Sequence, residues 1–234
     1  MYANGILFTI STCGMEFSLS FICYNYQMTL LSNNENRYKL SFTAIGLGLT
    51  ESITVAEAYQ SCHNWEYTKT IVKENNLLQS RTNRRNTRVV REIIHRLSGL
   101  SDEQLELLLG GTLEDQRLLL WFAICNYYKI IREFAIEVLQ EKFLTMDMHL
   151  SDIDYQAFFL RKMEWHPELD EITESTQVKL RTVVFRMMRE AGLLDNDNHI
   201  IRIIPSISLS NALKSHAEFA YHIYPSFPHE FGGN

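Results

Sequence analysis

The sequence has little proline, glycine or cysteine, with four, ten and four of these residues among 234. So few prolines and glycines exclude a collagen or a low-complexity array, and a 46% hydrophobic content excludes a chain that is disordered overall. A chain of this length buries most of its unfolded surface, so its core needs no disulfide or metal. The composition therefore indicates an ordinary globular protein of one large domain or two small ones.

The four cysteines, Cys13, Cys23, Cys62 and Cys125, lack the spacing of a disulfide framework or a zinc site. None belongs to a C-x-x-C pair, and no histidine stands at ligand spacing from them. We interpret them as reduced core thiols of a cytoplasmic protein. The sequence predicts no metal and no cofactor.

Catalytic motifs are missing as well. The run Gly46-Leu47-Gly48 is neither a dinucleotide-binding G-x-G-x-x-G nor a phosphate-binding G-x-x-x-x-G-K loop, and there is no G-x-S-x-G. Asp152 with Asp154 fits a helix cap, and Asp195 with Asp197 fits a hairpin turn, better than either pair fits a metal site. We therefore expect a protein that is not an enzyme and has no small-molecule ligand.

Positive charge is absent from the start of the chain, where no lysine or arginine precedes Arg37. Residues 6–24 are apolar enough to suggest a membrane span, but Glu16 lies at their centre and basic flanks are lacking. Met28 opens a polar segment that is typical of a protein start. We expect residues 1–36 to be an extension outside the core, with Met28 as an alternative start, and we expect no membrane partner.

From Tyr38 onward the apolar spacing is helical. Capping residues and glycine stops predict helices over residues 54–65, a short segment to about 75, 83–97, 101–110, 112–126, about 130–143, 152–163, and from 173 or 175 to 191. The chain is therefore predicted to be mainly α, a multi-helix bundle.

The spacing of apolar residues is no longer helical after Gly192. Leu193 and Leu194, a polar turn over residues 195–198, and residues 199–204 predict a short β-hairpin. A helix followed at once by a hairpin is the chain order of a winged helix. We predict a helical domain at 37–150, a winged-helix-like domain at 151–215, and an aromatic tail at 216–234 that is either a docking tail or a loosely ordered end.

The formal net charge of −6 argues against a nucleic-acid binder, but the charge is unevenly spread. Residues 81–96 hold six of the fourteen arginines and one acid, a local charge of +5 that leaves −11 for the rest of the chain. On a helix, Arg84, Arg88, Arg91 and His95 share one face. Planar guanidinium groups bind phosphate bidentately, which favours an anionic partner. Pairing with the acids of residues 102–115, or with an acidic protein, is the alternative.

A second basic face is predicted on the helix that ends near residue 191. Lys179, Thr182, Arg186 and Arg189 lie at helical spacing, and no acid occurs between residues 177 and 189. In a winged helix this helix would enter the major groove of DNA. A plain amphipathic helix with basic residues near its C-terminal end explains the pattern equally well.

Three segments resemble the BrxA family of BREX bacteriophage-exclusion systems. They are NNLLQSRT (75–82), IREFAIEVLQEKFL (131–144) and EWHPELDEITESTQVKLRTVVFRMMREAGLL (164–194). The resemblance covers about residues 38–204. It implies a mainly helical fold, likened in parts to the antitermination factor NusB and to helix-turn-helix modules. It also implies a soluble, non-enzymatic component that binds double-stranded DNA beside other BREX components.

We therefore predict a protein of phage defence that binds double-stranded DNA mainly through phosphate. The predicted contacts are Arg81, Arg84, Arg85, Arg88, Arg91, Lys179, Arg186 and Arg189. An adaptor that docks an acidic protein on the arginine face is the main alternative. RNA binding, by analogy with NusB, is the third.

Overall fold

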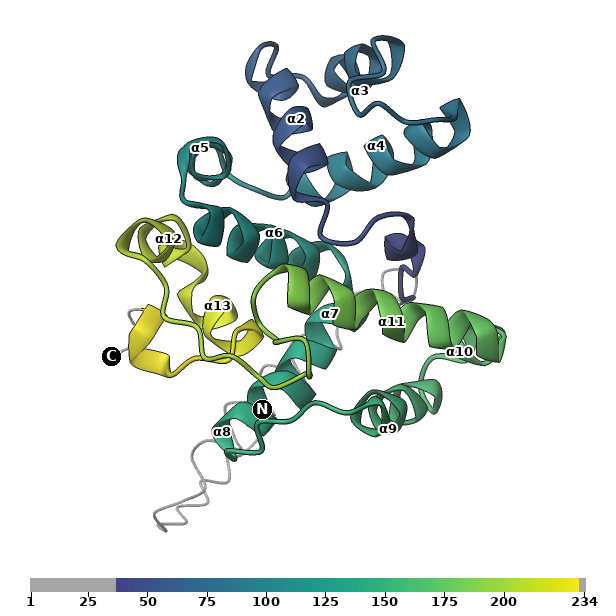
Figure 1. Ribbon diagram of the computed structural model, residues 1–234, viewed down its shortest axis with the longest axis vertical. Helices are drawn as coiled ribbons and strands as arrows, with labels where there is room; N and C mark the ends of the chain where they lie inside the picture. Colours follow the sequence, from purple (N-terminus) through teal and green to yellow (C-terminus); the bar gives the residue numbers. More distant parts are fainter. Residues whose placement is uncertain (1–36, 232–234) are drawn as a thin grey trace, which may run out of the picture. The chain divides into compact units, whose positions relative to one another are not determined.

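Helices make up almost all of the regular structure in residues 37–231, the part of the chain that the computed structural model describes (Figure 1). The prediction of a mainly α-helical protein is confirmed. The residues from Tyr38 onward belong to one compact unit. The extension predicted over residues 1–36, with its apolar run and its alternative start, lies outside the described residues.

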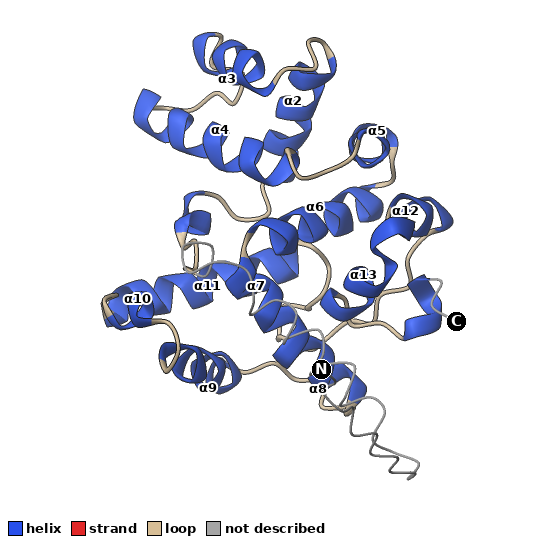
Figure 2. Ribbon diagram, turned by 180° about the vertical axis from the view of Figure 1, so that it is seen from behind, coloured by secondary structure: helices blue, strands red, loops and turns tan. Residues whose placement is uncertain are grey.

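The first group of elements runs to residue 144. It comprises the 3₁₀ turn η1 (Ser41–Ala44), α2 (Leu49–Gln60), α3 (Trp65–Glu74), α4 (Asn83–Leu97), α5 (Asp102–Gly110), α6 (Leu113–Tyr127), α7 (Lys129–Phe134), the π-helical turn η2 (Ala135–Gln140) and α8 (Glu141–Leu144). Helices α2, α3 and α4 pack together, and α4 also packs on α6 (Figures 1 and 2).

The second group begins at residue 152. It comprises α9 (Asp152–Met163), α10 (Pro167–Asp170), α11 (Glu174–Glu190), α12 (Ile207–Ala212), the 3₁₀ turn η3 (Lys214–His216), α13 (Ala217–Ile223) and the 3₁₀ turn η4 (Pro228–Phe231). Helix α11 packs against η1 and α6, so elements far apart in the sequence meet there. In the described part of the chain, no helix is both long and apolar enough to cross a bilayer.

Local sequence signals explain most helix ends. Thr82, Thr112 and Thr173 each accept a hydrogen bond from the backbone three residues on, and Ser101 forms the predicted capping box with Gln104. At the other end of α11, Gly192 takes the left-handed conformation, with φ at 82°.

One predicted helix start is wrong. The helix expected from Thr54 begins at Leu49, and Thr54 instead donates its hydroxyl to the carbonyl of Thr50 inside the helix. Gly48 allows the earlier start because it adopts φ 69°, a left-handed conformation that disfavours other residues.

The core centres on α6 and on the continuous stretch from α7 to α8, as predicted for a helix apolar on a wide face. The last segment completes it. The indole of Trp121 donates to the carbonyl of Ile223 at 2.9 Å, and the Tyr224 hydroxyl donates to the carbonyl of Leu118 at 2.6 Å. The segment around residues 223 and 224 is therefore tied to α6 and packs in the core, while its exposed residues leave the predicted docking role open as a prediction.

The winged-helix prediction is not supported. Residues 195–198 do turn, but the described residues contain no strand, and Leu194 meets Ile200 through one isolated bridge. Ile200 donates its backbone N–H to Met148, and Ile203 donates to Pro225. Backbone bonds do cross the turn, from Asp195 to the carbonyl of His199 and from Ile201 to that of Leu193. The pairing goes no further than one bridge, because Ile203 donates to Pro225 instead.

Candidate nucleic-acid interface

Five arginines converge on one cavity of about 880 Å³, which we call the arginine groove. One side of it is the segment from Thr43 to Glu51, which includes the loop that joins η1 to α2, and α4, α6 and α11 supply the other side chains. The arginines are Arg84, Arg85 and Arg88 from α4, Arg117 from α6, and Arg186 from α11. Parts of both basic faces predicted from the sequence therefore meet in one site.

Most of these guanidinium groups have no charged partner. Within the described residues, Arg84, Arg85 and Arg117 form no ion pair, and Arg88 donates one hydrogen bond to the Thr43 hydroxyl at 3.2 Å. Arg186 lies 3.7 Å from Glu190. The expected alternative, pairing of the arginines with the acids of residues 102–115, does not occur in the described structure. Because Glu51 and Glu190 are the two acids in the lining, the groove keeps a net positive charge.

A buried arginine holds the loop on this side of the groove. Arg96 is 1% exposed, and its guanidinium donates to the carbonyls of Gly46 at 2.7 Å, Ile45 at 3.2 Å and Leu47 at 3.4 Å. Arg96 is one of the six arginines in the basic segment 81–96, but because it is buried its role is structural. Its side chain fixes the backbone of the loop that the exposed arginines surround.

Glu92, the one acid of the basic segment, is also buried. It accepts hydrogen bonds from the Ser41 hydroxyl at 2.9 Å and the Tyr128 hydroxyl at 2.5 Å. Burial, together with the adjacent Glu92, raises the pKa of Tyr128 to about 12, against the opposing effect of Arg96. Tyr128 therefore remains a neutral donor at physiological pH, and the network connects η1 to α4 and α6.

A carboxylate from α11 reaches the same loop. Glu190 accepts the backbone N–H of Leu47 at 2.6 Å. A Cβ atom at Gly46 would lie 2.6 Å from the Glu190 carboxylate and 3.0 Å from Nε of Arg186. Gly46 lets these two side chains lie directly against the loop, which gives a role to a glycine that matched no phosphate-binding motif.

The remaining predicted contacts lie outside the groove lining. Arg81 and Lys179 are exposed, Arg91 pairs with Glu92 at 3.7 Å, and Arg189 donates to the side chain of Asn198 at 2.7 Å.

His95 does not continue the arginine face as a free side chain. Its ring stacks on Tyr127 with centroids 5.3 Å apart, and Nδ1 lies 3.1 Å from the Tyr127 hydroxyl. Burial, with help from Arg91 and nearby lysines, lowers the pKa of His95 against the opposing effect of Glu92. It is therefore a neutral, packed residue near pH 7.

Arg117 was missed by sequence reasoning. It is one basic residue in the run LEDQRLLL, where the apolar period predicts a core helix. The packing of α6 beneath α4 brings Arg117 to the groove, which local sequence cannot indicate.

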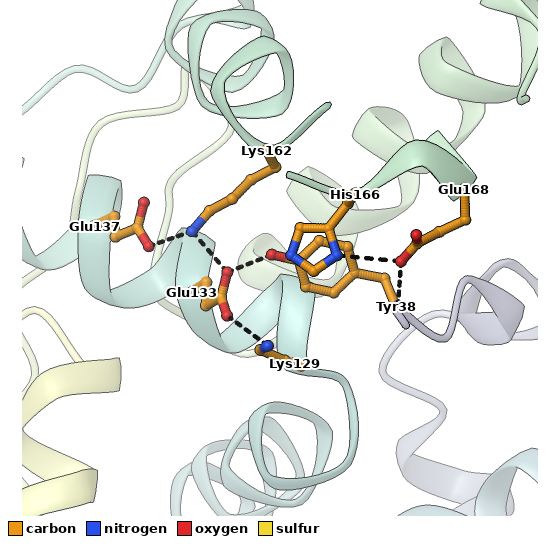
Figure 3. Close-up of polar contacts among 7 residues, drawn as sticks. All are labelled: Tyr38, Lys129, Glu133, Glu137, Lys162, His166 and Glu168. Atoms are coloured by element: carbon orange, nitrogen blue, oxygen red, sulfur yellow. Dashed lines mark hydrogen bonds and ion pairs between the residues drawn. The ribbon is translucent and has the colours of Figure 1, made fainter. Parts of the chain in front are cut away.

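A second cluster of charged side chains surrounds Tyr38 (Figure 3). The Tyr38 hydroxyl donates to Glu133 at 2.5 Å, its backbone N–H donates to Glu168 at 2.8 Å, and Lys162 bridges Glu133 at 2.7 Å and Glu137 at 2.5 Å. Burial raises the pKa of Glu133, but Lys162, Tyr38 and a nearby lysine outweigh it and hold that pKa below its usual range. These mutually paired charges form a structural clamp at the start of the compact unit.

The acidic turn offers little for a metal. Ligand atoms of Asp195, Asp197 and His199 lie within 4.8 Å of one another. One oxygen of Asp195 already accepts the backbone N–H groups of Asp197 at 2.9 Å and His199 at 2.8 Å. The predicted turn role accounts for the cluster, and Asp154 likewise belongs to the capping box of α9.

The cysteines in the described part of the chain carry free thiols. Cys125 is buried and Cys62 is half-buried. Burial raises the pKa of the Cys125 thiol well above its ordinary value, so this thiol is unreactive. The interpretation as a reduced core thiol is confirmed for Cys125, whereas Cys13 and Cys23 lie outside the described residues.

Comparison with known proteins agrees with this fold. The family model named BrxA matches residues 36–217. A protein of Bacillus cereus (strain H3081.97), named BREX protein BrxA, is 28% identical over 121 residues, which span 52% of this chain and 60% of that protein. The crystal structure of an uncharacterized protein from Magnetospirillum magneticum matches with a TM-score of 0.71 at 19% identity, over 81% of this chain and 100% of the other, and shows likeness of fold alone. The match over residues 36–217 establishes that the chain belongs to the BrxA family.

Proposed function

We propose that this protein is a non-enzymatic, double-stranded-DNA-binding component of a BREX phage-defence system. The name of its Bacillus relative supports the BREX part, and partners among other BREX components follow from it. The observation that carries the DNA-binding part is the arginine groove, where Arg84, Arg85 and Arg117 surround one cavity without ion-pair partners in the described structure. Guanidinium groups bind phosphate strongly because their planar donors match its oxygens.

The backbone adds to the attraction for phosphate. The first turns of α2 and α4 both line the groove, through residues 48–51 and through Thr82, Arg84 and Arg85. Helix N-termini carry free N–H groups and a partial positive charge, which favour anions. Such contacts position a duplex without reading its sequence.

An adaptor function is the second candidate, and exposed apolar residues favour it. Leu113 is 52% exposed one turn before Arg117 on α6, and Ile207 is 83% exposed. A hydrogen bond of 2.7 Å between Ser206 and Asp115 holds the start of α12 beside the start of α6. An acidic protein could contact these residues together with Arg117.

Fluorescence anisotropy with the full chain tests the proposal. Labelled duplex DNA, single-stranded DNA and RNA are titrated at two salt concentrations, with the parent and the double variant Arg84→Gln/Arg117→Gln. We expect duplex binding to weaken with salt, and the slope of log K against log salt to fall by about two in the variant, because each lost phosphate contact removes about one unit.

The double variant Arg161→Gln/Lys214→Gln is the matched control. Both residues are exposed, lie outside the groove and remove the same charge. Its slope and affinity should stay close to those of the parent. Equal losses in the two variants would refute a specific role for the groove. No duplex binding by the parent would refute the DNA-binding proposal and favour the adaptor, and a preference for RNA would favour the RNA-binding alternative.

A further inference from the structure

The arginine groove is a hollow open to solvent, and the five arginines that line it are exposed. Its volume of about 880 Å³ lies within the range of small-molecule sites, about 300 to 1,000 Å³. Five guanidinium groups and two carboxylates, those of Glu51 and Glu190, line it, which leaves a formal excess of three positive charges in one cavity. The net positive charge of the lining is thus gathered around one small hollow.

A duplex would engage only part of that concentration of positive charge. Each strand of a duplex presents one charge for about every 3.4 Å of helix axis, and the strand leaves any one cavity after a few phosphates. A linear triphosphate carries comparable charge within a single short anion. Convergent arginines from three helices therefore suit a compact polyanion as well as a short run of duplex phosphates.

The walls supply further groups suited to such an anion. No side chain caps the first turn of α2, which begins after Gly48 and lines the groove. Its first N–H groups have no partner within the helix, a general property of helix starts. Leu47 and Val89 back the groove and are nearly fully buried, whereas the guanidinium groups of the five arginines are open to solvent and to a ligand.

We propose that the arginine groove binds a compact polyphosphate, either inorganic tripolyphosphate or the phosphate tail of a nucleoside triphosphate. This ligand departs from the expectation, drawn from the sequence, that no small molecule binds. The inference goes beyond DNA binding and does not depend on it. If both ligands use the groove, polyphosphate and duplex compete for the same arginines.

Isothermal titration calorimetry on the full chain tests this at constant ionic strength. The probes are inorganic tripolyphosphate, adenosine triphosphate, adenosine monophosphate and sulfate, all without magnesium. We expect the two triphosphates to bind at least tenfold more tightly than the monophosphate and sulfate. Tighter binding of adenosine triphosphate than of tripolyphosphate would identify a nucleotide as the ligand, and the reverse order would identify an inorganic chain.

Variants locate the site. Arg84→Gln/Arg117→Gln should weaken tripolyphosphate binding at least tenfold, while Arg161→Gln/Lys214→Gln should change it less than twofold. Circular dichroism and thermal melting verify that each variant is folded. Arg186→Lys keeps the charge but loses the planar guanidinium group, so we expect it to lose an intermediate part of the tripolyphosphate affinity. Equal binding of sulfate and tripolyphosphate, or equal losses in the two double variants, would overturn the proposal.

Titration of the same samples with labelled duplex separates the two proposals. Polyphosphate binding without duplex binding would refute the DNA function and leave this inference standing. Duplex binding without polyphosphate binding would refute this inference alone. Where both bind, tripolyphosphate should displace the duplex at concentrations near its own dissociation constant.

Discussion

Arginine serves three purposes in this protein, and burial decides among them. Arg84 and Arg117 face the groove without charged partners in the described structure, Arg189 supports the turn at Asn198, and Arg96 is enclosed by backbone carbonyls. A charge count over residues 81–96 treats Arg84 and Arg96 alike. Only the packing of the loop on α4 separates a binding residue from a structural one.

Arg96→Met should destabilise the fold strongly. The substitution removes the donors to the carbonyls of Ile45, Gly46 and Leu47 and leaves those groups poorly satisfied in a buried place. We expect a loss of about 3 kcal/mol in the free energy of unfolding, measured by urea denaturation. Lys214→Met, at an exposed position, should change it by less than about 0.5 kcal/mol. A loss for Arg96→Met as small as that of the control would show that the loop does not need this residue.

At the scale of elements, the groove depends on a loop whose shape two glycines permit. Gly48 begins α2 in a left-handed conformation, and Gly46 allows Glu190 and Arg186 to approach the backbone. The loop therefore couples the start of α2 to the end of α11, on either side of the groove.

Gly46→Ala should disturb both stability and binding. Its Cβ would lie 2.6 Å from the Glu190 carboxylate, so that side chain must swing away and its hydrogen bond from the Leu47 backbone is weakened or lost. We expect a destabilisation of about 1 to 3 kcal/mol by urea denaturation, and weaker tripolyphosphate binding by calorimetry. Gly110→Ala is the matched control, because a Cβ there meets nothing within 4 Å. Unchanged stability and binding in Gly46→Ala would contradict the close approach of loop and helix.

The capping box of α5 gives a second prediction at this scale. Ser101 accepts from the backbone of Gln104, and the Gln104 side chain accepts from the backbone of Ser101. Ser101→Ala should cost about 1 kcal/mol in thermal or urea unfolding. Ser98→Ala, an exposed serine that does not cap the start of a helix, should cost clearly less. Equal costs would show that the box contributes nothing to stability.

Features that depend on contacts within one helix could be predicted from the sequence, and features that depend on contacts between distant segments could not. The bounds of α4 and the caps at Ser101, Thr112 and Thr173 follow from local hydrogen bonding and apolar period. The start of α2 was missed because it depends on the backbone angle of Gly48. The expected hairpin stops after the bridge between Leu194 and Ile200 because Ile203 bonds to Pro225, a partner that local alternation of side chains does not reveal.

The candidate site shows the same division. The sequence indicated the arginines of α4 and Arg186 as basic faces on two helices, and the structure brings four of those side chains together. It could not place Arg117, nor show that Arg96 is buried, since both depend on which helices pack. Residue type and spacing therefore predicted the chemistry of the groove, whereas tertiary packing determined which residues line it.

At the scale of the whole molecule, both ends of the compact unit are tied to its centre. Tyr38 is bound through Glu133 to the α7 region, and Tyr224 is bound to α6 through Leu118. Separating either end would expose buried side chains and unpaired polar groups. The clamp at Tyr38 also ties global stability to pH, because its central carboxylate is ionised and paired.

Glu133 should make unfolding sensitive to acid. Its pKa is lowered in the folded state from an ordinary 4.5, so its stabilising contribution is fully present above about pH 4.5 and is lost as pH falls through the folded value. Glu133→Gln should therefore cost about 1.5 to 3 kcal/mol at pH 7, by loss of charge-assisted bonds from Lys162 and Tyr38, and progressively less below pH 4.5. Urea unfolding of both proteins from pH 7 to pH 3 measures the difference. Other carboxylates with lowered pKa values, such as Asp154, destabilise both proteins alike in acid and cancel in that difference. A difference that stays constant across this range would show that the charge of Glu133 does not hold the clamp together.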